Sequence, residues 1–359
     1  MKYLIPSGIV GLMLVLSMTG CESGGGSIAL TSGWAIGWDQ NQTAVILHTG
    51  DGLNWNVQGD TSLWTGHSGT DISAVDYLTA WAVLASSVSD FAGGLILHTT
   101  DGGTTWCLQT LPVLVPEGMK GIKGVSRNEA WAVGLRGPVL HTVNGGQTWT
   151  VISTGDVTFQ EVNRMDVLGN DIWIADHHNG DTGIVHSPDN GQTWRYEQLP
   201  SVQDPHGPMT MSIVNSKVAW TTVNGQGDIY RTQDGGVTWK MDASEVVGGL
   251  FDIDDLCAVS ENEAWFVQNL SSSGGYVMRI SIGGTIIKKG WNLGNYAYEG
   301  VSAFDESTAW IVGFKSSFNR PDLPDGSILY TSDGETWTSQ PLPVSNVALW
   351  KISIVGARR

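Results

Sequence analysis

The sequence has 359 residues, of which only 15% are charged, and it contains 47 Gly and 17 Trp. Asp and Glu outnumber Lys and Arg by 35 to 18, and the formal charge of −17 argues against a nucleic acid partner, whose phosphates such a chain repels. The low charge and high Gly content are typical of β structure with many turns, and no long 3.6-residue period indicates amphipathic helices.

The N-terminal segment has the pattern of an export signal. Residues 1–20 contain one Lys, then an apolar run too short to span a membrane, then small residues. "SMTGC" resembles the bacterial lipobox, in which the cysteine becomes the lipidated first residue; an ordinary signal peptide and an uncut anchor are the alternatives. We expect a lipoprotein-type signal at 1–20, a Gly/Ser linker at 21–27, and an exported protein anchored to the cell envelope through acyl chains on Cys21. Glu22 differs from the Asp that retains lipoproteins in the inner membrane, which leaves an outer-membrane address open.

From residue 28 onward the chain is built of repeats. An Ala-Trp or related segment recurs every 42 to 50 residues, at Trp34, Trp81, Trp131, Trp173, Trp220, Trp265 and Trp310. Around each of these lie a hydrophobic segment, a polar turn, a loop, a segment such as "LILHT", and a final segment that starts at a further Trp. Four short strands repeated seven times predict an all-β fold, a seven-bladed β-propeller of four-stranded antiparallel blades, in a single domain over 28–359.

The two ends of the repeat array complement each other. The first unit has no clear first strand before Trp34, whereas "NVALWKISIVG" at 346–356 resembles a first strand with no unit after it. We expect this C-terminal strand to complete the first blade, because that pairing removes an open sheet edge.

A turn motif precedes the last strand of most units, as in "TTDGGTTW" at 99–106. Its glycines allow positive φ, its Asp and leading Thr or Ser can bond to backbone amides of the same turn, and its Trp can pack on a neighbouring hairpin. The sixth unit keeps only "SIGGT", and a structural motif tolerates such a loss. We therefore expect a structural role for Asp51, Asp101, Asn144, Asp189, Asp234, Asp333, Trp55, Trp106, Trp149, Trp194, Trp239 and Trp337.

The motif "S/T-x-D-x-G-x-T-W" resembles the Asp-box, or bacterial neuraminidase repeat. Together with "AWAVG" and "ILHT" in repeated units behind a signal, it resembles the photosystem II assembly and stability factor family over nearly all of 28–356. The resemblance implies a non-catalytic chaperone that binds a membrane-protein precursor, with the boxes on the face away from the functional one. Photosynthetic members present an Arg-rich patch; here the nine Arg are spread along the chain, a departure that sets this chain apart from them.

Polar loops offer candidate binding groups. "ADHHNGD" has metal-ligand residue types, but adjacent His side chains on an extended segment point in opposite directions, so a solvated loop is the preferred interpretation and we predict no metal and no cofactor. The blade-linking loop "PSVQDPHGP" has a similar character. "GFKSSFNRPDLPDGS" is the largest insertion, and is either a recognition loop or simply solvated. The candidate binding-face residues are Asp176, His177, His178, Asp181, Asp204, His206, Lys315, Arg320, Asp322 and Asp325.

The remaining reactive side chains are assigned to structure. Cys107 and Cys257 lie 150 residues apart in different repeats, and we expect two buried free thiols. Four His residues occupy the same place just before the box in separate units, and we expect strand residues too far apart to form one site: His48, His98, His141 and His186.

We expect a non-enzymatic scaffold or assembly factor that binds a protein of unknown identity in an envelope or membrane complex. The alternative is a cell-surface carbohydrate-binding or glycoside hydrolase propeller of the sialidase type, since Asp-boxes occur in such enzymes. A sialidase requires an arginine cluster and placed carboxylates, but the first Arg of this chain is Arg127 and the "Arg-Ile-Pro" segment of sialidases is absent.

Overall fold

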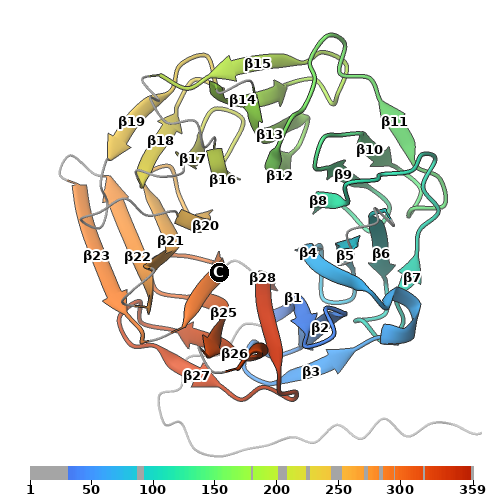
Figure 1. Ribbon diagram of the computed structural model, residues 1–359. Helices are drawn as coiled ribbons and strands as arrows, with labels where there is room; N and C mark the ends of the chain where they lie inside the picture. Colours follow the sequence, from blue (N-terminus) through green and yellow to red (C-terminus); the bar gives the residue numbers. More distant parts are fainter. Residues whose placement is uncertain are drawn as a thin grey trace, which may run out of the picture.

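The computed structural model describes residues 31–86, 93–178, 181–200, 208–223, 227–243, 253–270, 274–282, 286–294, 296–317 and 320–356. Within these residues the strands form seven sheets of four antiparallel strands each, arranged as blades around one axis (Figure 1). This confirms the predicted seven-bladed propeller. The described residues contain one 3-10 helix, η1 (Thr61–Trp64), and no helix long and apolar enough to cross a membrane.

The strands of each blade run from the axis outward. The inner strands of blades 1 to 7 are β28 (Val347–Gly356), β4 (His67–Ala74), β8 (Met119–Gly124), β12 (Val162–Leu168), β16 (Pro208–Ile213), β20 (Ile253–Ala258) and β24 (Ala297–Ala303). The second strands are β1 (Thr31–Asp39), β5 (Ala80–Ser86), β9 (Ala130–Gly134), β13 (Asp171–His178), β17 (Ala219–Val223), β21 (Glu263–Leu270) and β25 (Ala309–Ser317).

The third strands are β2 (Ala44–Thr49), β6 (Leu95–Thr99), β10 (Val139–Thr142), β14 (Asp181–Ser187), β18 (Asp228–Thr232), β22 (Gly274–Ile282) and β26 (Arg320–Thr331). The outer strands are β3 (Trp55–Gln58), β7 (Cys107–Leu108), β11 (Thr150–Ile152), β15 (Arg195–Gln198), β19 (Lys240–Ala243), β23 (Ile286–Asn292) and β27 (Thr338–Gln340).

Ring closure follows the prediction from sequence. The C-terminal strand β28 pairs antiparallel with β1, from Thr31 opposite Gly356 to Asp39 opposite Val347. Blade 1 is therefore assembled from both ends of the described chain, and neither β1 nor β28 is left as an open edge.

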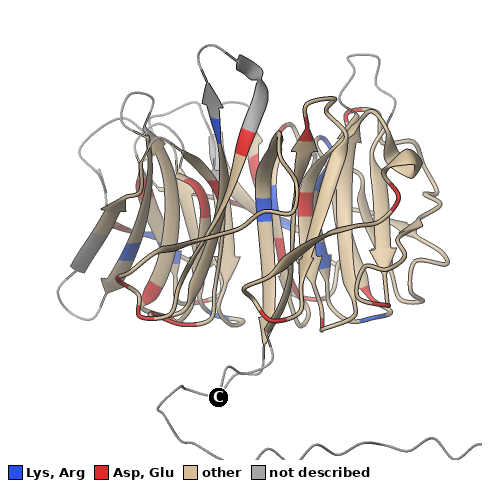
Figure 2. Cartoon of the chain, turned by 90° about the horizontal axis from the view of Figure 1, so that it is seen from below, with Lys and Arg blue, Asp and Glu red and all other residues tan. Residues whose placement is uncertain are grey.

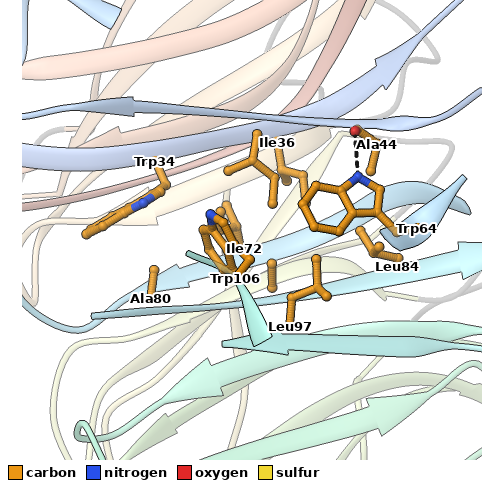
Figure 3. Packing of buried hydrophobic residues seen from close by; sticks show 11 residues of the cluster. Trp34, Ile36, Ala44, Trp64, Ile72, Ala80, Leu84, Leu97 and Trp106 are labelled. Carbon is orange, nitrogen blue, oxygen red and sulfur yellow. Dashed lines mark hydrogen bonds between the residues drawn. The ribbon is translucent and has the colours of Figure 1, made fainter. Parts of the chain in front are cut away.

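The core lies between blades, in seven clusters that each join two neighbours. Figure 3 shows the cluster between blades 1 and 2, where Trp34 and Ile36 of β1 face Ile72 of β4. Trp64 of η1 closes it, and its indole donates a hydrogen bond to the carbonyl of Ala44 at 2.9 Å. The Ala-Trp tryptophans are 0–2% exposed, because each indole fills the layer between two sheets.

The propeller has two different faces (Figure 2). We call one the Asp-box face; it has the turns between third and outer strands and those between inner and second strands. The other, the loop face, has the turns between second and third strands and the links between blades. Thr31 lies at the Asp-box face, since a Cβ on Gly52 of the first box would meet its Cγ2 at 2.8 Å.

Candidate functional site

The inner strands share an irregularity that shapes the axis. Each has a register shift against its second strand near the middle, as between Gly69 and Asp71 or between Tyr298 and Gly300. Such a β-bulge re-aims side chains. Aligned on the bulge, the seven strands place one residue each in a first axial ring: Asp71, Gly121, Arg164, Thr210, Asp255, Gly300 and Lys351.

The first axial ring is an ion network across the axis. The guanidinium of Arg164 contacts Asp71 Oδ1 at 3.1 Å and Asp255 Oδ1 at 4.0 Å, and Lys351 Nζ lies 3.2 Å from Asp255 Oδ1. The side chains of Asp71 and Asp255 are 3% and 1% exposed. The inner strands of blades 1, 2, 4 and 6 are thereby connected at one level by paired charges, and each contact passes over one blade.

The pKa values of the two buried carboxylates, Asp71 and Asp255, are shifted in opposite directions. Burial raises the pKa of Asp71, and the nearby Arg164 only partly offsets it. Burial also acts on Asp255, but Lys351 and Arg164 outweigh it and hold the pKa of that carboxyl below its usual range. Each group is already engaged by a cation, so neither is placed as an uncommitted general acid or base.

Two carboxylates of the first ring also link consecutive blades. The amide N–H of Ile122 donates to Asp71 Oδ2 at 3.0 Å, and that of Val301 donates to Asp255 Oδ2 at 3.2 Å. Both donors belong to the inner strand of the next blade. The two carboxylates therefore accept hydrogen bonds from backbone N–H groups that have no partner within a sheet.

A second axial ring lies two residues further along each strand, towards the Asp-box face. It consists of Ser73, Lys123, Asp166, Ser212, Cys257, Ser302 and Ser353. Most of its oxygen atoms accept an N–H from the next inner strand, as in Gly124 to Ser73 at 3.1 Å and Ala74 to Ser353 at 3.0 Å. Lys123 Nζ lies 2.8 Å from Asp166 Oδ1, and this contact raises the pKa of Lys123. Side chains of both rings therefore connect the inner strands of different blades.

The bulge residues themselves lie one position nearer the loop face. Those whose side chains are described are Thr70, Lys120, Asn163, Asp254, Glu299 and Trp350. Burial raises the pKa of Glu299 to about 7, although Lys351 and a 3.0 Å hydrogen bond from Asn269 Nδ2 oppose it. Trp350 belongs to an aromatic cluster: its ring centroid lies 5.2 Å from that of Trp38, which lies 6.0 Å from that of Phe314.

The "ADHHNGD" segment forms the end of the β13–β14 hairpin. Asp176 is fully buried and accepts N–H bonds from Gln160 at 3.2 Å and Glu161 at 3.0 Å, so it anchors the link between blades 3 and 4. His177 Nδ1 lies 3.8 Å from Glu161 Oε2. His178 and Asp181 are paired in register, and their side chains lie outside the described residues. No group of three or more His, Cys, Asp or Glu in the described part of the chain could hold a metal ion.

The other predicted loops are described only in part. Asp204 and His206 lie outside the described residues. Lys315 and Asp325 are exposed and lie opposite each other in the β25–β26 hairpin, at the loop face. Asp325 accepts a 3.1 Å hydrogen bond from the Tyr296 hydroxyl. Arg320 and Asp322 lie in β26, and their side chains are not described.

In all six boxes the leading Thr or Ser hydroxyl donates to the Asp or Asn Oδ1 and accepts a Gly N–H. In blade 5 the Thr232 hydroxyl donates to Asp234 at 2.9 Å and accepts the Gly236 N–H at 2.8 Å, while Asp234 accepts from Thr238 N at 2.9 Å and Oγ1 at 2.6 Å. These hydrogen bonds lower the pKa of Asp234, and the bond from the Thr238 hydroxyl has the largest effect. The shorter copy at Asp51 uses Leu53 and Asn54 as donors, which outweigh burial and lower the pKa of Asp51 to about 2. The Asp carboxylate or Asn amide of every box is thus hydrogen-bonded within its own turn.

The residue before each box covers the Ala-Trp indole of its blade. His98 stacks on Trp81 at 3.5 Å and 5°, and His141 and His186 stack in the same way in their separate blades, whereas the ring of His48 is tilted by 34° against Trp34. Arg231, Arg279 and Tyr330 take this position in blades 5 to 7. Four of these residues were predicted from sequence to be strand residues; the equivalent Arg and Tyr were missed because the residue type changes while its planar shape remains.

The expectation of two buried thiols was wrong for Cys107, and Cys257 is only partly buried. Cys107 is exposed, because it begins the short outer strand β7 at the rim of the ring. Cys257 lies in the second axial ring, and burial raises the pKa of its thiol to about 11. Both are free cysteines.

The axial rings were not found from the sequence, although a signal existed. Aligning the inner strands as "DISA", "GVSA" and "KISI" places Asp71, Lys351 and the Ser positions in register. The rings become visible only when that alignment is combined with the closed sevenfold arrangement.

Fold and site together define a class of molecule: a seven-bladed propeller whose Asp-boxes are turn structures and whose inner strands are bridged by ion pairs. The family model described as "Photosynthesis system II assembly factor YCF48" matches residues 118–292. The chain is thus similar to this family over residues 118–292, in agreement with the resemblance seen in its sequence.

Individual relatives agree with this assignment. The chain is 24% identical over 187 residues to the "Photosystem II assembly lipoprotein Ycf48" of Synechococcus sp. (strain CC9902), a match that covers 51% of this chain and 49% of that protein. The match thus spans about half the length of this curated relative. Among solved structures, "YCF48 bound to D1 peptide" has a TM-score of 0.59 at 18% identity, over 80% of this chain and 91% of that one. "YCF48 from Cyanidioschyzon merolae" has a TM-score of 0.58 at 13% identity, over 90% and 96%. At these identities the structures show the shared fold.

Proposed function

We propose that this chain is an exported, lipid-anchored, non-catalytic propeller that binds a partner protein through its loop face and assists assembly or stability of a membrane or envelope complex. The observation that carries the proposal is the contrast between the two faces. On the Asp-box face the motif side chains are committed to their own turns, whereas the loop face presents partly exposed aromatic and charged groups.

The comparisons support the protein-binding part of the proposal. One relative is named a photosystem II assembly lipoprotein, and one structure of similar fold is described as bound to D1 peptide. The lipid anchor rests on Cys21 in "SMTGC", together with the lipoprotein name of that relative. Absence of an Arg cluster makes a partner other than that of the photosynthetic members the expected one.

Affinity capture tests this function. The full-length chain, purified from detergent-solubilised membranes of its host, is expected to retain a membrane protein, and Cys21→Ser is expected to move the chain from the membrane to the soluble fraction. Capture that persists when the loop face is altered, but fails when the Asp-box face is altered, would place binding on the wrong face. A mature mass without acyl groups would contradict the anchor.

A glycoside hydrolase is the competing function, and the axis disfavours it. Glycosidases use two carboxyl groups that flank a substrate, one of them free to give a proton. Asp71 and Asp255 are instead buried and paired with Arg164 and Lys351. Turnover of fluorogenic glycosides by the purified chain, lost in Asp255→Asn, would reverse this conclusion.

A further inference from the structure

Three aromatic side chains form a cluster at the loop face that belongs to none of the seven core clusters. Trp38 lies at the end of β1, Phe314 near the end of β25, and Trp350 in the bulge of β28. Trp38 contacts both others, at 5.2 Å and 47° for Trp350 and at 6.0 Å and 61° for Phe314. All three are partly exposed. We call this cluster the aromatic rim.

The aromatic rim differs from the other tryptophan contacts of the chain because none of its rings packs against a core cluster. The Ala-Trp indoles are fully enclosed, and the partly exposed Trp194, Trp291 and Trp337 each pack against a core cluster. The part of an indole that stays in contact with water adds no hydrophobic stabilisation to the fold, because the inter-blade clusters form without it. Partly exposed aromatic side chains of this kind dominate binding energy at protein interfaces.

The described charges around the aromatic rim are mostly acidic. Asp39 follows Trp38 directly, Glu299 lies in the neighbouring inner strand β24, and the exposed Asp325 lies on the hairpin that holds Phe314. Lys315 is the basic residue on that same hairpin, and Lys351 below is committed to Asp255. Because Glu299 is buried and its pKa is raised to about 7, the ionised carboxylates beside the rim are Asp39 and Asp325, and the exposed cation is Lys315. Together with the charge of −17 on the chain, this balance favours a basic partner.

We propose that the aromatic rim is the docking site for a basic, apolar segment of the partner protein, in which Lys or Arg side chains alternate with large apolar ones. The apolar side chains pack between the tilted rings, and the basic ones meet the ring faces and the carboxylate of the exposed Asp325. The rings are inclined to one another rather than coplanar, which suits inserted side chains better than a flat sugar ring. The inference rests on the proposed protein-binding function and names its site.

The test uses labelled peptides of equal length, one alternating Leu and Lys and one alternating Leu and Glu, with chito- and cello-oligosaccharides as a separate arm. Fluorescence anisotropy with the full-length chain in detergent gives Kd. We expect the Leu–Lys peptide to bind at least about tenfold more tightly than the Leu–Glu peptide. Trp350→Ala is expected to weaken its binding by about tenfold and Asp325→Asn by a few-fold, whereas Trp350→Phe retains most of it.

Val237→Ala is the matched control, because Val237 is 75% exposed on a box turn of the opposite face. It should leave Kd unchanged, and unfolding midpoints of all variants show whether the ring is intact. Equal binding of both peptides, or an unchanged Kd in Trp350→Ala, overturns the proposal. Oligosaccharide binding that Trp350→Ala abolishes overturns it in favour of a sugar site. Capture of a membrane protein that survives Trp350→Ala leaves the proposed function standing and removes only this site.

Discussion

The two faces of the ring use the same residue types for different purposes. On the Asp-box face, Asp234 accepts bonds from its own turn and Trp239 is 7% exposed between blades. On the loop face, Asp325 is exposed and Trp350 is only partly covered. A carboxylate or an indole therefore says little about function by its type alone; whether local bonds already satisfy it decides which face can recognise a partner.

The largest effect is expected from opening the ring, which underlies both faces. Deleting residues 346–359 removes β28 and exposes the edge of β1, so the chain should lose its cooperative unfolding transition or associate through that edge. Deleting only 357–359 is the control. Size-exclusion chromatography and thermal unfolding measure the outcome, and a stable monomer with an unchanged midpoint would contradict ring closure.

The axis between the faces gives the next largest effect. Arg164→Met leaves Asp71 without its cation and Asp255 with only Lys351, and should lower the free energy of unfolding by about 3–5 kcal/mol. The double variant Arg164→Met/Asp71→Asn should recover part of the loss, because it also removes a buried charge. Urea unfolding measures both, and a loss below about 1 kcal/mol for the single variant would show that the network is not needed.

A direct comparison of the two faces uses one tryptophan from each. Trp239→Ala empties a core position and should cost about 3–5 kcal/mol of unfolding free energy. Trp350→Ala removes a partly exposed ring and should cost under about 2 kcal/mol. Urea unfolding of the two variants side by side checks this order, and equal losses would mean that the aromatic rim belongs to the core.

Protonation of His98 and protonation of the box carboxylates should lower the stability of the fold in different pH ranges. Burial against Trp81 lowers the pKa of His98 from 6.5 to about 4. Below pH 6.5 the unfolded chain takes up a proton that the folded chain does not, so stability should fall by up to ~1.4 kcal/mol per pH unit until about pH 4. The lowered pKa values of the box carboxylates instead remove stability only as the pH falls below about 4.

His98→Tyr is the matching variant, since Tyr330 occupies this position in blade 7. Unfolding free energies between pH 7.5 and 4 should show a flatter profile than in the parent chain. If the variant and the parent chain show the same dependence of unfolding free energy on pH, groups other than His98 cause the loss of stability.

The smallest effect is chemical and leaves the fold unchanged. Cys107 at the rim should react with a thiol reagent in the native state, whereas Cys257, whose pKa burial raises to about 11, should react only on unfolding. Labelling followed by peptide mass analysis distinguishes the two; native modification of Cys257 would mean that the axis opens.

Local patterns were enough to predict the blades, and ring closure could be predicted because a missing strand at one end matched an extra one at the other. The axial charges could not be predicted in the same way. Their position holds Asp71, Gly121, Arg164 and other types in turn, so aligning segments such as "DISA" and "KISI" locates the position but not the ion pairs formed there. Pairs such as Arg164 with Asp71 form only when blades 2 and 4 meet across the axis.

The aromatic rim shows the same limit. Trp38 and Trp350 lie near opposite ends of the sequence, and each belongs to a segment that reads as an ordinary strand. They come together because β28 completes the first blade and places its bulge beside the end of β1. Contacts created by closure of a ring have no local signature, and the most prominent loop motif, "ADHHNGD", instead contains the buried Asp176 that anchors a neighbouring link.

Entry of the chain at the Asp-box face has a consequence for orientation. Thr31 lies beside the first box, and an extended stretch from Cys21 to Thr31 reaches roughly 35 Å at most. If Cys21 carries the proposed lipid, the tether joins the ring at the Asp-box face, and with that face towards the bilayer the aromatic rim is turned towards the aqueous side. A membrane-embedded partner would have to offer its basic segment as a projecting loop or tail, at about the height of the propeller above the bilayer.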